Sequence, residues 1–214
     1  MNRIARALLF STICLAYTSA FAQQDFSADV VNGRNPDHKT KVYVTKTKMR
    51  LEDSSKGGMM GGIIINTETQ VWDILMPPRQ MYMETSDADR MPMARNMFKF
   101  FRPTDAEDGC THWTKLKRPS DPDWDCRKIG DETVNGRSTV KYEGTSKKSG
   151  THNVWIDKKI VFPIKWQSND DSGESSGELQ NIQEGPQAAS LFEIPSDYQK
   201  MDMSQMMMGH SPKQ

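Results

Sequence analysis

Apolar and polar residues alternate with a period of two along much of this chain. The clearest run begins at Ile160 and continues through Phe162, Ile164 and Trp166. Successive side chains of a β-strand point to opposite faces of a sheet, so this period is typical of strands with one buried face. Segments rich in turn-forming residues separate the runs, as at 169–177. The pattern predicts a mainly β fold in which consecutive strands form a meander.

The predicted strands are set apart by this alternation and by their β-branched and aromatic residues. Pro77 and Pro78 must interrupt pairing, because proline cannot donate a backbone N–H to a neighbouring strand. The glycine-rich segment 57–62 (GGMMGG) is predicted to be a flexible hairpin loop. The predicted strands span residues 26–30, 41–51, 63–66, 70–75, 80–84, 137–142, 151–157, 160–166 and 179–184.

The segment Arg90–Phe101 has helical periodicity instead, and Pro103 follows it as a stop signal. It predicts a short amphipathic helix with an unusually large apolar face. That face is either ordinary core or a lid over a hollow that the sheet does not fill by itself. Its residues are Met93, Met97, Phe98, Phe100 and Phe101. The polar stretch 105–128 that follows predicts an elaborated loop.

The first 22 residues have the pattern of a secretory signal peptide. Arg3 and Arg6 precede an apolar stretch at 7–16, and Ala20-Phe21-Ala22 provides a small-residue cleavage site. The apolar stretch is too short to cross a bilayer, which needs roughly 20 apolar residues. We therefore expect export to the periplasm or the medium, and no transmembrane segment after cleavage. The remainder predicts one domain over 23–200 and an unstructured, Met-rich tail over 201–214.

Composition refines this picture. Only 36% of the residues are hydrophobic, which is low for a globular domain and predicts a thin core. Cys110 and Cys126 are the two cysteines that follow the signal peptide. An even pair in an oxidising compartment predicts a disulfide, although two unlinked thiols are the alternative. By closing this loop, the disulfide would stabilise the fold by roughly 3 kcal/mol in the chain-entropy model.

Charge and motifs exclude several function classes. The chain carries 28 basic and 28 acidic residues, and loss of Arg3 and Arg6 would leave an excess of two acidic side chains. A nucleic-acid-binding protein is usually basic, so that partner is disfavoured. The segment Gly173–Gly177 fits the G-x-S-x-G nucleophile motif, but its polar flanks predict a hairpin turn instead of a buried strand entering a helix. No nucleophile, base and orienting group can be assembled, so we expect no enzyme.

Methionine is the unusual feature of the composition, with 15 residues. Thioethers are soft ligands that bind Cu(I), and the tail places several of them beside a histidine. The alternatives for the tail are a copper site and an unstructured segment without a ligand. Its candidate ligands are Met206, Met207, Met208 and His210. A second candidate, His112 beside Cys110, is more simply explained by a loop closed by the disulfide.

Three segments resemble the periplasmic lipoprotein carriers of the LolA/LolB type, and more closely an uncharacterised exported domain allied to them. Gly61–Glu84 is similar to the central meander of the carriers. Val154–Gln167 is similar to their later Trp-Ile-Asp, turn, Phe-Pro hairpin, and Leu191–Tyr198 to their closing F-x-x-P strand. The resemblance implies a strongly curved antiparallel sheet, or half-barrel, with a short covering helix. The hollow of such a sheet accepts acyl chains or another apolar guest.

These observations together predict an exported, non-enzymatic protein that binds a lipid or other apolar ligand without a cofactor. An envelope protein could deliver that ligand. The alternatives are a periplasmic copper-handling protein that uses the tail, and a structural protein whose own side chains fill the hollow. The predicted ligand contacts are Trp72, Ile74, Tyr82, Met93, Met97, Phe98 and Phe101.

Overall fold

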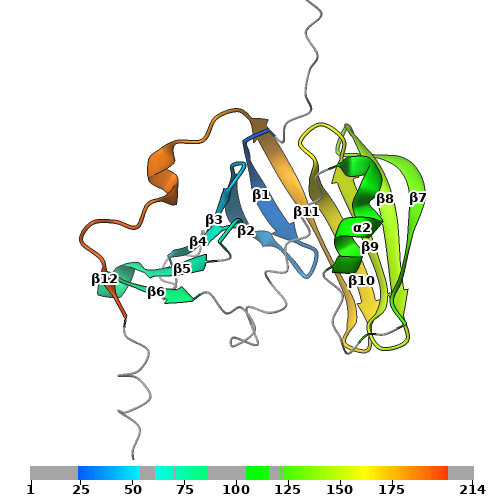
Figure 1. The fold of residues 1–214 in the computed structure, drawn as a ribbon, viewed down its shortest axis with the longest axis horizontal. Coiled ribbons are helices and arrows are strands. Elements are labelled where there is room, and N and C mark those ends of the chain that lie inside the picture. Colours follow the sequence, from blue (N-terminus) through cyan, green and yellow to red (C-terminus); the bar gives the residue numbers. More distant parts are fainter. Residues whose placement is uncertain are drawn as a thin grey trace, which may run out of the picture.

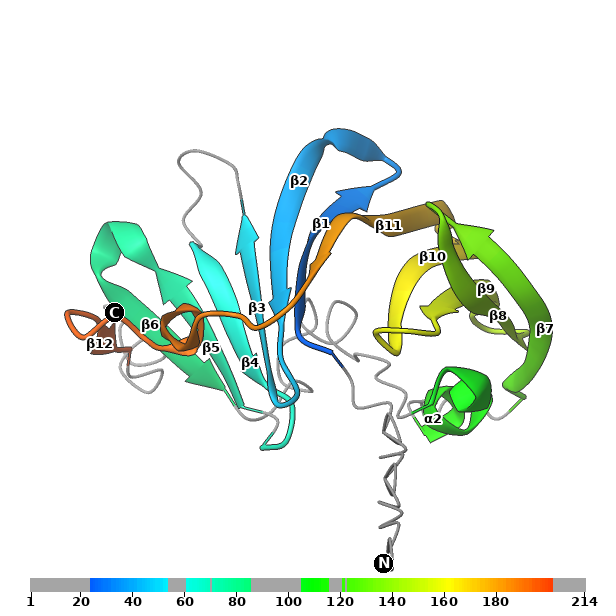
Figure 2. The same cartoon turned by 90° about the horizontal axis from the view of Figure 1, so that it is seen from above.

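The strands of this chain form one large open sheet that curves strongly (Figure 1, Figure 2). The computed structural model describes residues 24–53, 61–69, 71–85, 105–115, 121 and 123–201. Within these residues the sheet has 12 strands in the order β12-β6-β5-β4-β3-β2-β1-β11-β10-β9-β8-β7. Its neighbours pair antiparallel, except that β12 runs parallel to β6. The predicted fold class, a mainly β chain with a curved antiparallel sheet, is confirmed.

The first half of the chain forms a meander at one end of the sheet, and the second half forms another at the opposite end. The first comprises β1 (Phe26–Asn32), β2 (Asn35–Val44), β3 (Lys48–Asp53), β4 (Gly62–Asn66), β5 (Val71–Met76) and β6 (Met81–Thr85). The second comprises β7 (Asp125–Val134), β8 (Arg137–Ser146), β9 (Gly150–Asp157), β10 (Phe162–Asp170) and β11 (Gly173–Glu184). Pairing of β1 with β11 joins the two meanders, and β12 (Gln199–Lys200) closes the first edge.

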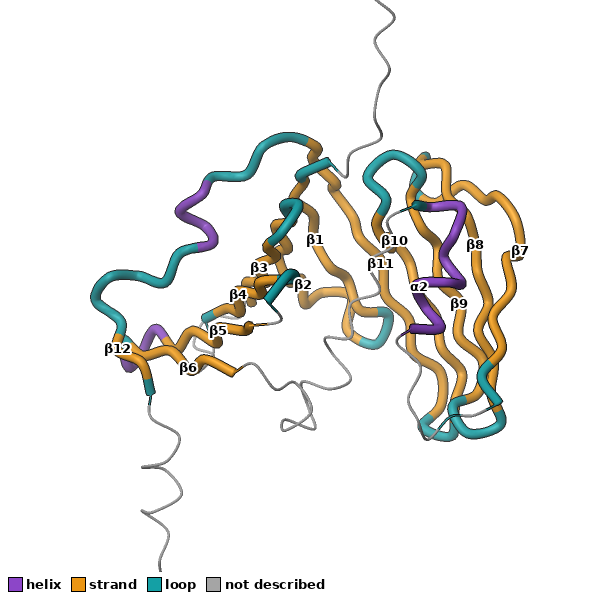
Figure 3. Tube along the Cα trace, viewed as in Figure 1, coloured by secondary structure: helices purple, strands orange, loops and turns teal. Residues whose placement is uncertain are grey.

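Helical segments are short, as Figure 3 shows in purple. The α-helix α2 (Gly109–Lys115) follows the 3₁₀ turn η2 (Ala106–Asp108). Two further 3₁₀ turns are η1 (Pro77–Arg79), between β5 and β6, and η3 (Ala189–Phe192), after β11. The helix predicted over Arg90–Phe101 lies outside the described residues. The polar stretch 105–128, predicted to be a loop, contains α2 and the start of β7.

Among the strand boundaries that differ from the prediction, two are explained by local turn chemistry. The predicted strand 41–51 is two strands, since a turn after Val44 closes where Thr45 N donates to Lys48 O over 2.8 Å. The Thr45 hydroxyl donates to the same carbonyl over 3.1 Å and accepts from Lys48 N over 3.0 Å. The predicted turn 169–177 is shorter than expected, because β10 continues to Asp170 and β11 resumes at Gly173.

Three apolar clusters hold this sheet together. The largest, cluster 1, combines buried side chains from β1–β5 with others from β7, from β9–β11 and from the β9–β10 turn. Cluster 2 joins η2 and α2 to β8 and β9 through Ala106, Tyr142 and Ile156. Cluster 3 lies on the other side of the first meander, where Ile64 and Leu75 contact Phe192. The thin core predicted from composition is therefore divided among three clusters.

Candidate apolar ligand site

The first meander presents two parallel rows of apolar side chains on one face. The first row crosses the strands in register as Phe26, Val44, Met49, Ile65 and Trp72. The second crosses them as Ala28, Val42, Leu51, Ile63, Ile74 and Met83. We call these rows the apolar rungs. Each strand contributes alternate residues to them, because alternate side chains share a face.

The second meander closes one end of the apolar rungs. The Phe26 and Phe162 rings meet edge to face, with centroids 5.1 Å apart. Ile160, Ile164 and Leu179 belong to the same cluster and are buried. Aromatic pairs in this geometry contribute roughly 0.5–1.5 kcal/mol beyond the area they bury. The bend of the sheet between β1 and β11 is thus held by apolar contact between the two meanders.

Neither α2 nor η3 covers the apolar rungs on β2–β6. Helix α2 packs on β8 and β9 of the second meander, as Figure 2 shows from above. The segment around η3 packs against Ile64, Leu75 and Tyr82, which point to the opposite face of β4–β6. Within the described residues, the face that carries the apolar rungs is therefore the one without a covering helix.

The residues predicted to bind a ligand fall into three groups. Trp72 and Ile74 lie in the apolar rungs and are buried. Tyr82 pairs with Leu75, so its side chain lies on the opposite face, in cluster 3. The remaining predicted contacts and the predicted copper ligands lie outside the described residues: Met93, Met97, Phe98, Phe101, Met206, Met207, Met208 and His210.

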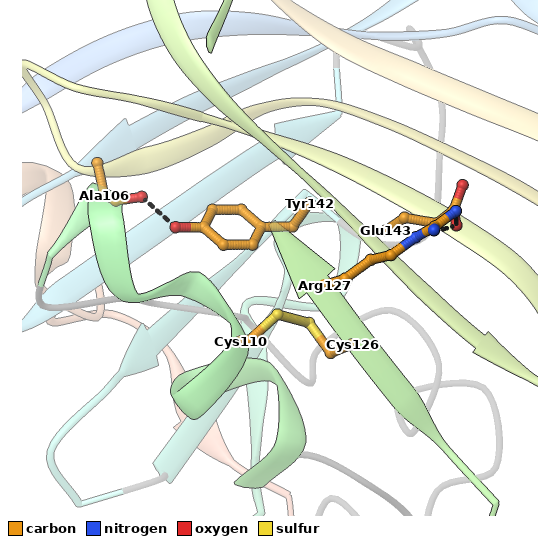
Figure 4. Close-up of a disulfide and its surroundings, with 6 residues drawn as sticks. All are labelled: Ala106, Cys110, Cys126, Arg127, Tyr142 and Glu143. Atoms are coloured by element: carbon orange, nitrogen blue, oxygen red, sulfur yellow. Dashed lines mark hydrogen bonds and ion pairs between the residues drawn. A yellow bond between two sulfur atoms is a disulfide. The ribbon is translucent and has the colours of Figure 1, made fainter. Parts of the chain in front are cut away.

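The predicted disulfide is present, and it ties α2 to the edge strand β7 (Figure 4). Cys110 and Cys126 are joined with an S–S distance of 2.05 Å. The Tyr142 hydroxyl donates to the Ala106 carbonyl over 2.9 Å just before the helix. A Cβ atom at Gly109 would lie 2.6 Å from the Tyr142 ring, so glycine lets the helix begin this close to the sheet. Burial raises the pKa of the Tyr142 hydroxyl.

Sequence reasoning missed this helical corner, although a capping signal was present. Asp105 accepts a hydrogen bond from Glu107 N over 2.8 Å, as a helix-capping side chain does. Two tryptophans complete the corner, Trp113 from α2 and Trp124 from the segment before β7, with ring centroids 5.2 Å apart. The corner is held by the disulfide and aromatic contacts instead of a long periodic pattern.

The C-terminal segment 186–201 crosses the face opposite the apolar rungs. We call it the strap. Arg50 Nη1 donates to the Leu191 carbonyl over 2.7 Å, and Lys48 Nζ donates to the Phe192 carbonyl over 3.4 Å. Gln199 N then donates to Gln80 O over 2.9 Å as β12 joins β6. Two backbone carbonyls of the strap are therefore satisfied by cationic side chains from β3.

Asp73 lies on the strap face of β5 in a half-buried position. Its Oδ1 atom is shielded from solvent without a hydrogen-bond partner among the described residues. Burial, and then the charge of Glu84, raise the pKa of this carboxyl, while Lys200 and Lys48 oppose the shift. A carboxyl whose pKa is higher in the folded than in the unfolded state stabilises the fold at low pH. That contribution is lost as the pH rises through the folded-state pKa.

We expect Asp73→Asn to stabilise the protein by about 1 kcal/mol at pH 7, because it removes a poorly solvated charge. This increase in the free energy of unfolding should become smaller as the pH falls through the pKa of Asp73, because the wild-type carboxyl then becomes neutral as well. Urea unfolding at several pH values measures both effects. Asp37→Asn, at an exposed position of β2, is the matched control and should change little. Equal effects of the two substitutions at pH 7 would contradict the prediction.

The described residues also contain an open hollow of about 430 Å³ between the β7–β8 turn and β11. Leu179 and Ile182 contribute apolar wall, and Arg137 and Asn181 contribute polar wall. Its mixed lining distinguishes it from the apolar rungs.

Within the part of the chain that is described, no group of three or more His, Cys, Asp or Glu side chains could hold a metal ion. No described helix has the length and apolarity needed to span a bilayer.

The chain was compared with known protein families by sequence and with solved structures by fold. A family model described as a domain of unknown function (DUF4412) matches residues 159–198, which include β10, β11 and most of the strap. No curated protein matches the sequence. An uncharacterized conserved protein from Thermus thermophilus is structurally similar, with a TM-score of 0.53 and 14% identity. That match covers 85% of this chain and 91% of the Thermus protein.

Two other solved structures are similar over only part of their length or with a lower TM-score. The complex structure of Pseudomonas aeruginosa MucA/MucB matches with a TM-score of 0.50 and 14% identity, over 83% of this chain and 58% of that chain. A LolA-superfamily protein from Nitrosomonas europaea matches at a TM-score of 0.34 and 10% identity, over 80% and 90% of the two chains. At that score the similarity carries no inference about a ligand. What the comparisons establish is a fold shared with the Thermus protein over nearly its whole length.

Proposed function

We propose that this chain is an exported, non-enzymatic binding protein that holds a lipid or another apolar molecule on the apolar rungs. The observation that supports this most directly is the composition of the rungs. From Phe26 to Trp72 and from Ala28 to Met83, every side chain in register is apolar. A face of this kind is stable only under an apolar cover, because each Å² removed from water contributes roughly 25 cal/mol.

The order of strands in the sheet supports a proposal for the source of part of that cover. Strand β6 ends at Thr85, and η2 begins at Ala106 beside β8. In the sheet order β6 and β8 belong to opposite meanders, with β5, β4, β3, β2, β1, β11, β10 and β9 between them. The described residues at the two ends of this connection, Thr85 and Asp105, therefore lie at different meanders. The strap already occupies the opposite face of the first meander.

We infer that this connection crosses the side that carries the apolar rungs. It contains the predicted helix Arg90–Phe101, whose Met93, Met97, Phe98 and Phe101 would face the rungs. Methionine is flexible and polarizable, and it adapts to guests of variable shape. A ligand held between this segment and the rungs would contact Trp72 and Ile74 from the sheet. Tyr82, on the strap face, is not part of the proposed site.

Export is consistent with the disulfide between Cys110 and Cys126, because such bonds persist in oxidising compartments and are rare in the cytosol. The signal-peptide pattern of residues 1–22 agrees with the same compartment.

Native mass spectrometry of the full chain, purified from the envelope of its own host, tests the proposal. We expect co-purifying lipid, and uptake of a long-chain fluorescent fatty acid after delipidation. Met97→Glu and Phe98→Glu should each weaken that uptake at least tenfold, roughly, since a carboxylate would have to be buried against the rungs. Met203→Glu, in the tail, is the matched control and should leave uptake unchanged.

A mass without lipid, together with no uptake of the fatty acid, would overturn the proposal. That result would favour a structural protein in which the connecting segment fills the hollow permanently. Uptake that both Glu variants leave unchanged would equally remove the segment 90–101 from the site.

A further inference from the structure

A second hollow, of about 630 Å³, lies on the second meander next to the β1–β2 turn. We call it the polar groove. Its floor includes two rows of side chains in register across β9, β10 and β11. The first row is Asn153, Gln167 and Ser176, and the second is Thr151, Asn169 and Glu174. Members of both rows share one face of the sheet, because they are separated by two residues along each strand.

The β1–β2 turn forms the wall of the polar groove and is fixed firmly in place. Gly33 N donates to Ser176 O over 2.9 Å, and a Cβ at Gly33 would lie 2.2 Å from Ser176 Oγ. Glycine therefore allows the turn to lie directly on β11. Arg34 Nη2 and Nε donate to the Glu174 carbonyl over 2.7 and 3.1 Å. These bonds hold the guanidinium at the rim, and its other N–H donors are uncommitted among the described residues.

The floor has hydrogen-bonding capacity that the fold does not use. Among the described residues, the side chains of Asn153, Gln167, Asn169 and Thr151 have no hydrogen-bond partner. Each amide offers two donors and one acceptor oxygen, and the hydroxyl both donates and accepts. Neighbouring members of a row lie roughly 5 Å apart, because that is the spacing of paired strands. The floor is thus an ordered array of side chains that can both donate and accept hydrogen bonds.

Charge and size narrow the class of ligand. The ionic side chains that line the groove are Arg34 and Glu174, of opposite sign, so the lining is neutral overall. A strongly charged ligand would find no net complement there. The volume falls within the roughly 300–1,000 Å³ typical of small-molecule sites. Sugar hydroxyls both donate and accept, so a saccharide can use donors and acceptors of the floor together.

We propose that the polar groove binds a short neutral oligosaccharide. Asn153 and Gln167 contact its hydroxyl groups from the floor, and Arg34 contacts it from the rim. This site is separate from the apolar rungs, and the inference does not rest on the proposed lipid binding. It would place a glycan on the second meander while an apolar ligand occupies the first.

Saturation-transfer NMR and calorimetric titration of the full chain test this inference. The probes are maltotriose, cellotriose and chitotriose, with an anionic oligogalacturonate of the same length for comparison. We expect at least one neutral trisaccharide to bind with a Kd of about 1 mM or tighter. Asn153→Ala and Gln167→Ala should each weaken that binding roughly fivefold to tenfold, as loss of one or two hydrogen bonds does.

Gln199→Ala is the matched control, because Gln199 is an exposed amide on β12 in the other meander. It should leave saccharide binding unchanged, as should Met97→Glu, which tests the lipid site instead. Absence of binding by all three neutral probes would overturn the inference. Binding of the anionic probe alone, or binding that neither floor variant weakens, would overturn it as well.

Discussion

Replacing Asp157 with alanine is expected to lower the free energy of unfolding by about 3 kcal/mol. Asp157 is 1% exposed at the end of β9, and both of its oxygens accept hydrogen bonds from the Arg137 guanidinium. Its Oδ1 also accepts from Lys159 N over 2.8 Å and Ile160 N over 2.9 Å. Alanine would leave those donors and a half-buried guanidinium without their partner.

Through its bonds with Lys159 N and Ile160 N, the same carboxylate supports a strained turn. Val161 has a φ of 49°, which a β-branched residue rarely adopts, and its N–H donates to the Asp157 carbonyl over 3.0 Å. Arg137 retains one partner in the variant, since Nη2 donates to Glu184 Oε1 over 2.8 Å. For that reason the expected loss lies at the lower end of the range for a broken buried pair.

Urea unfolding followed by far-UV circular dichroism measures the change. Asp170→Ala is the matched control, because Asp170 accepts a similar turn hydrogen bond from Ser172 N over 2.8 Å but makes no ion pair among the described residues. We expect it to cost about 1 kcal/mol or less. Similar losses for both variants would show that turn capping, and not the ion pair, carries the stability.

The double substitution Cys110→Ala, Cys126→Ala is expected to destabilise the protein by about 3 kcal/mol, through the added chain entropy of the unfolded state. The sequence separation of 16 sets that magnitude. The effect should concentrate in the helical corner, since α2 is short and the disulfide is its covalent link to β7. A short helix gains most of its stability from packing and not from its own hydrogen bonds.

Urea unfolding and near-UV circular dichroism of the tryptophans test this prediction. Reduced wild-type protein should behave as the double variant does, and oxidised wild type should keep the near-UV signal of Trp113 and Trp124. A loss below 1 kcal/mol with an unchanged tryptophan signal would contradict it. In that case the noncovalent contacts of the corner, including those of Tyr142 and Trp113, would be enough to hold it.

The two predictions concern the second meander, which supports both proposed sites. Asp157, Arg137 and Glu184 connect the β9–β10 turn to β8 and to the end of β11. Strand β11 in turn pairs with β1, where the two meanders meet. A weakened network should therefore loosen the bend that brings Phe162 against Phe26 and closes the apolar rungs.

The order of residues along the chain is enough to specify most of the strands, their alternating faces and the pairing of the cysteines. These features are local or nearly so. A period of two depends on side-chain direction within one strand, and a cysteine pair in an exported chain has one possible connection. Trp72 and Ile74 could be assigned to the same buried face for that reason, since they are two residues apart on β5.

The turn between β5 and β6 determines the register of β6, and contacts between segments that are distant in sequence determine the positions of α2 and the strap. The predicted ligand site includes both Ile74 and Tyr82, but the turn at Pro77–Arg79 sets a register in which Tyr82 pairs with Leu75, on the opposite face from Ile74. A shift of one residue in register reverses the face of every side chain in a strand, and the turn geometry that sets it is not visible in an alternating pattern. Helix α2 and the strap likewise depend on distant contacts, with Tyr142 for the first and Arg50 for the second. Long-range packing, not local periodicity, therefore positions the covers of this sheet.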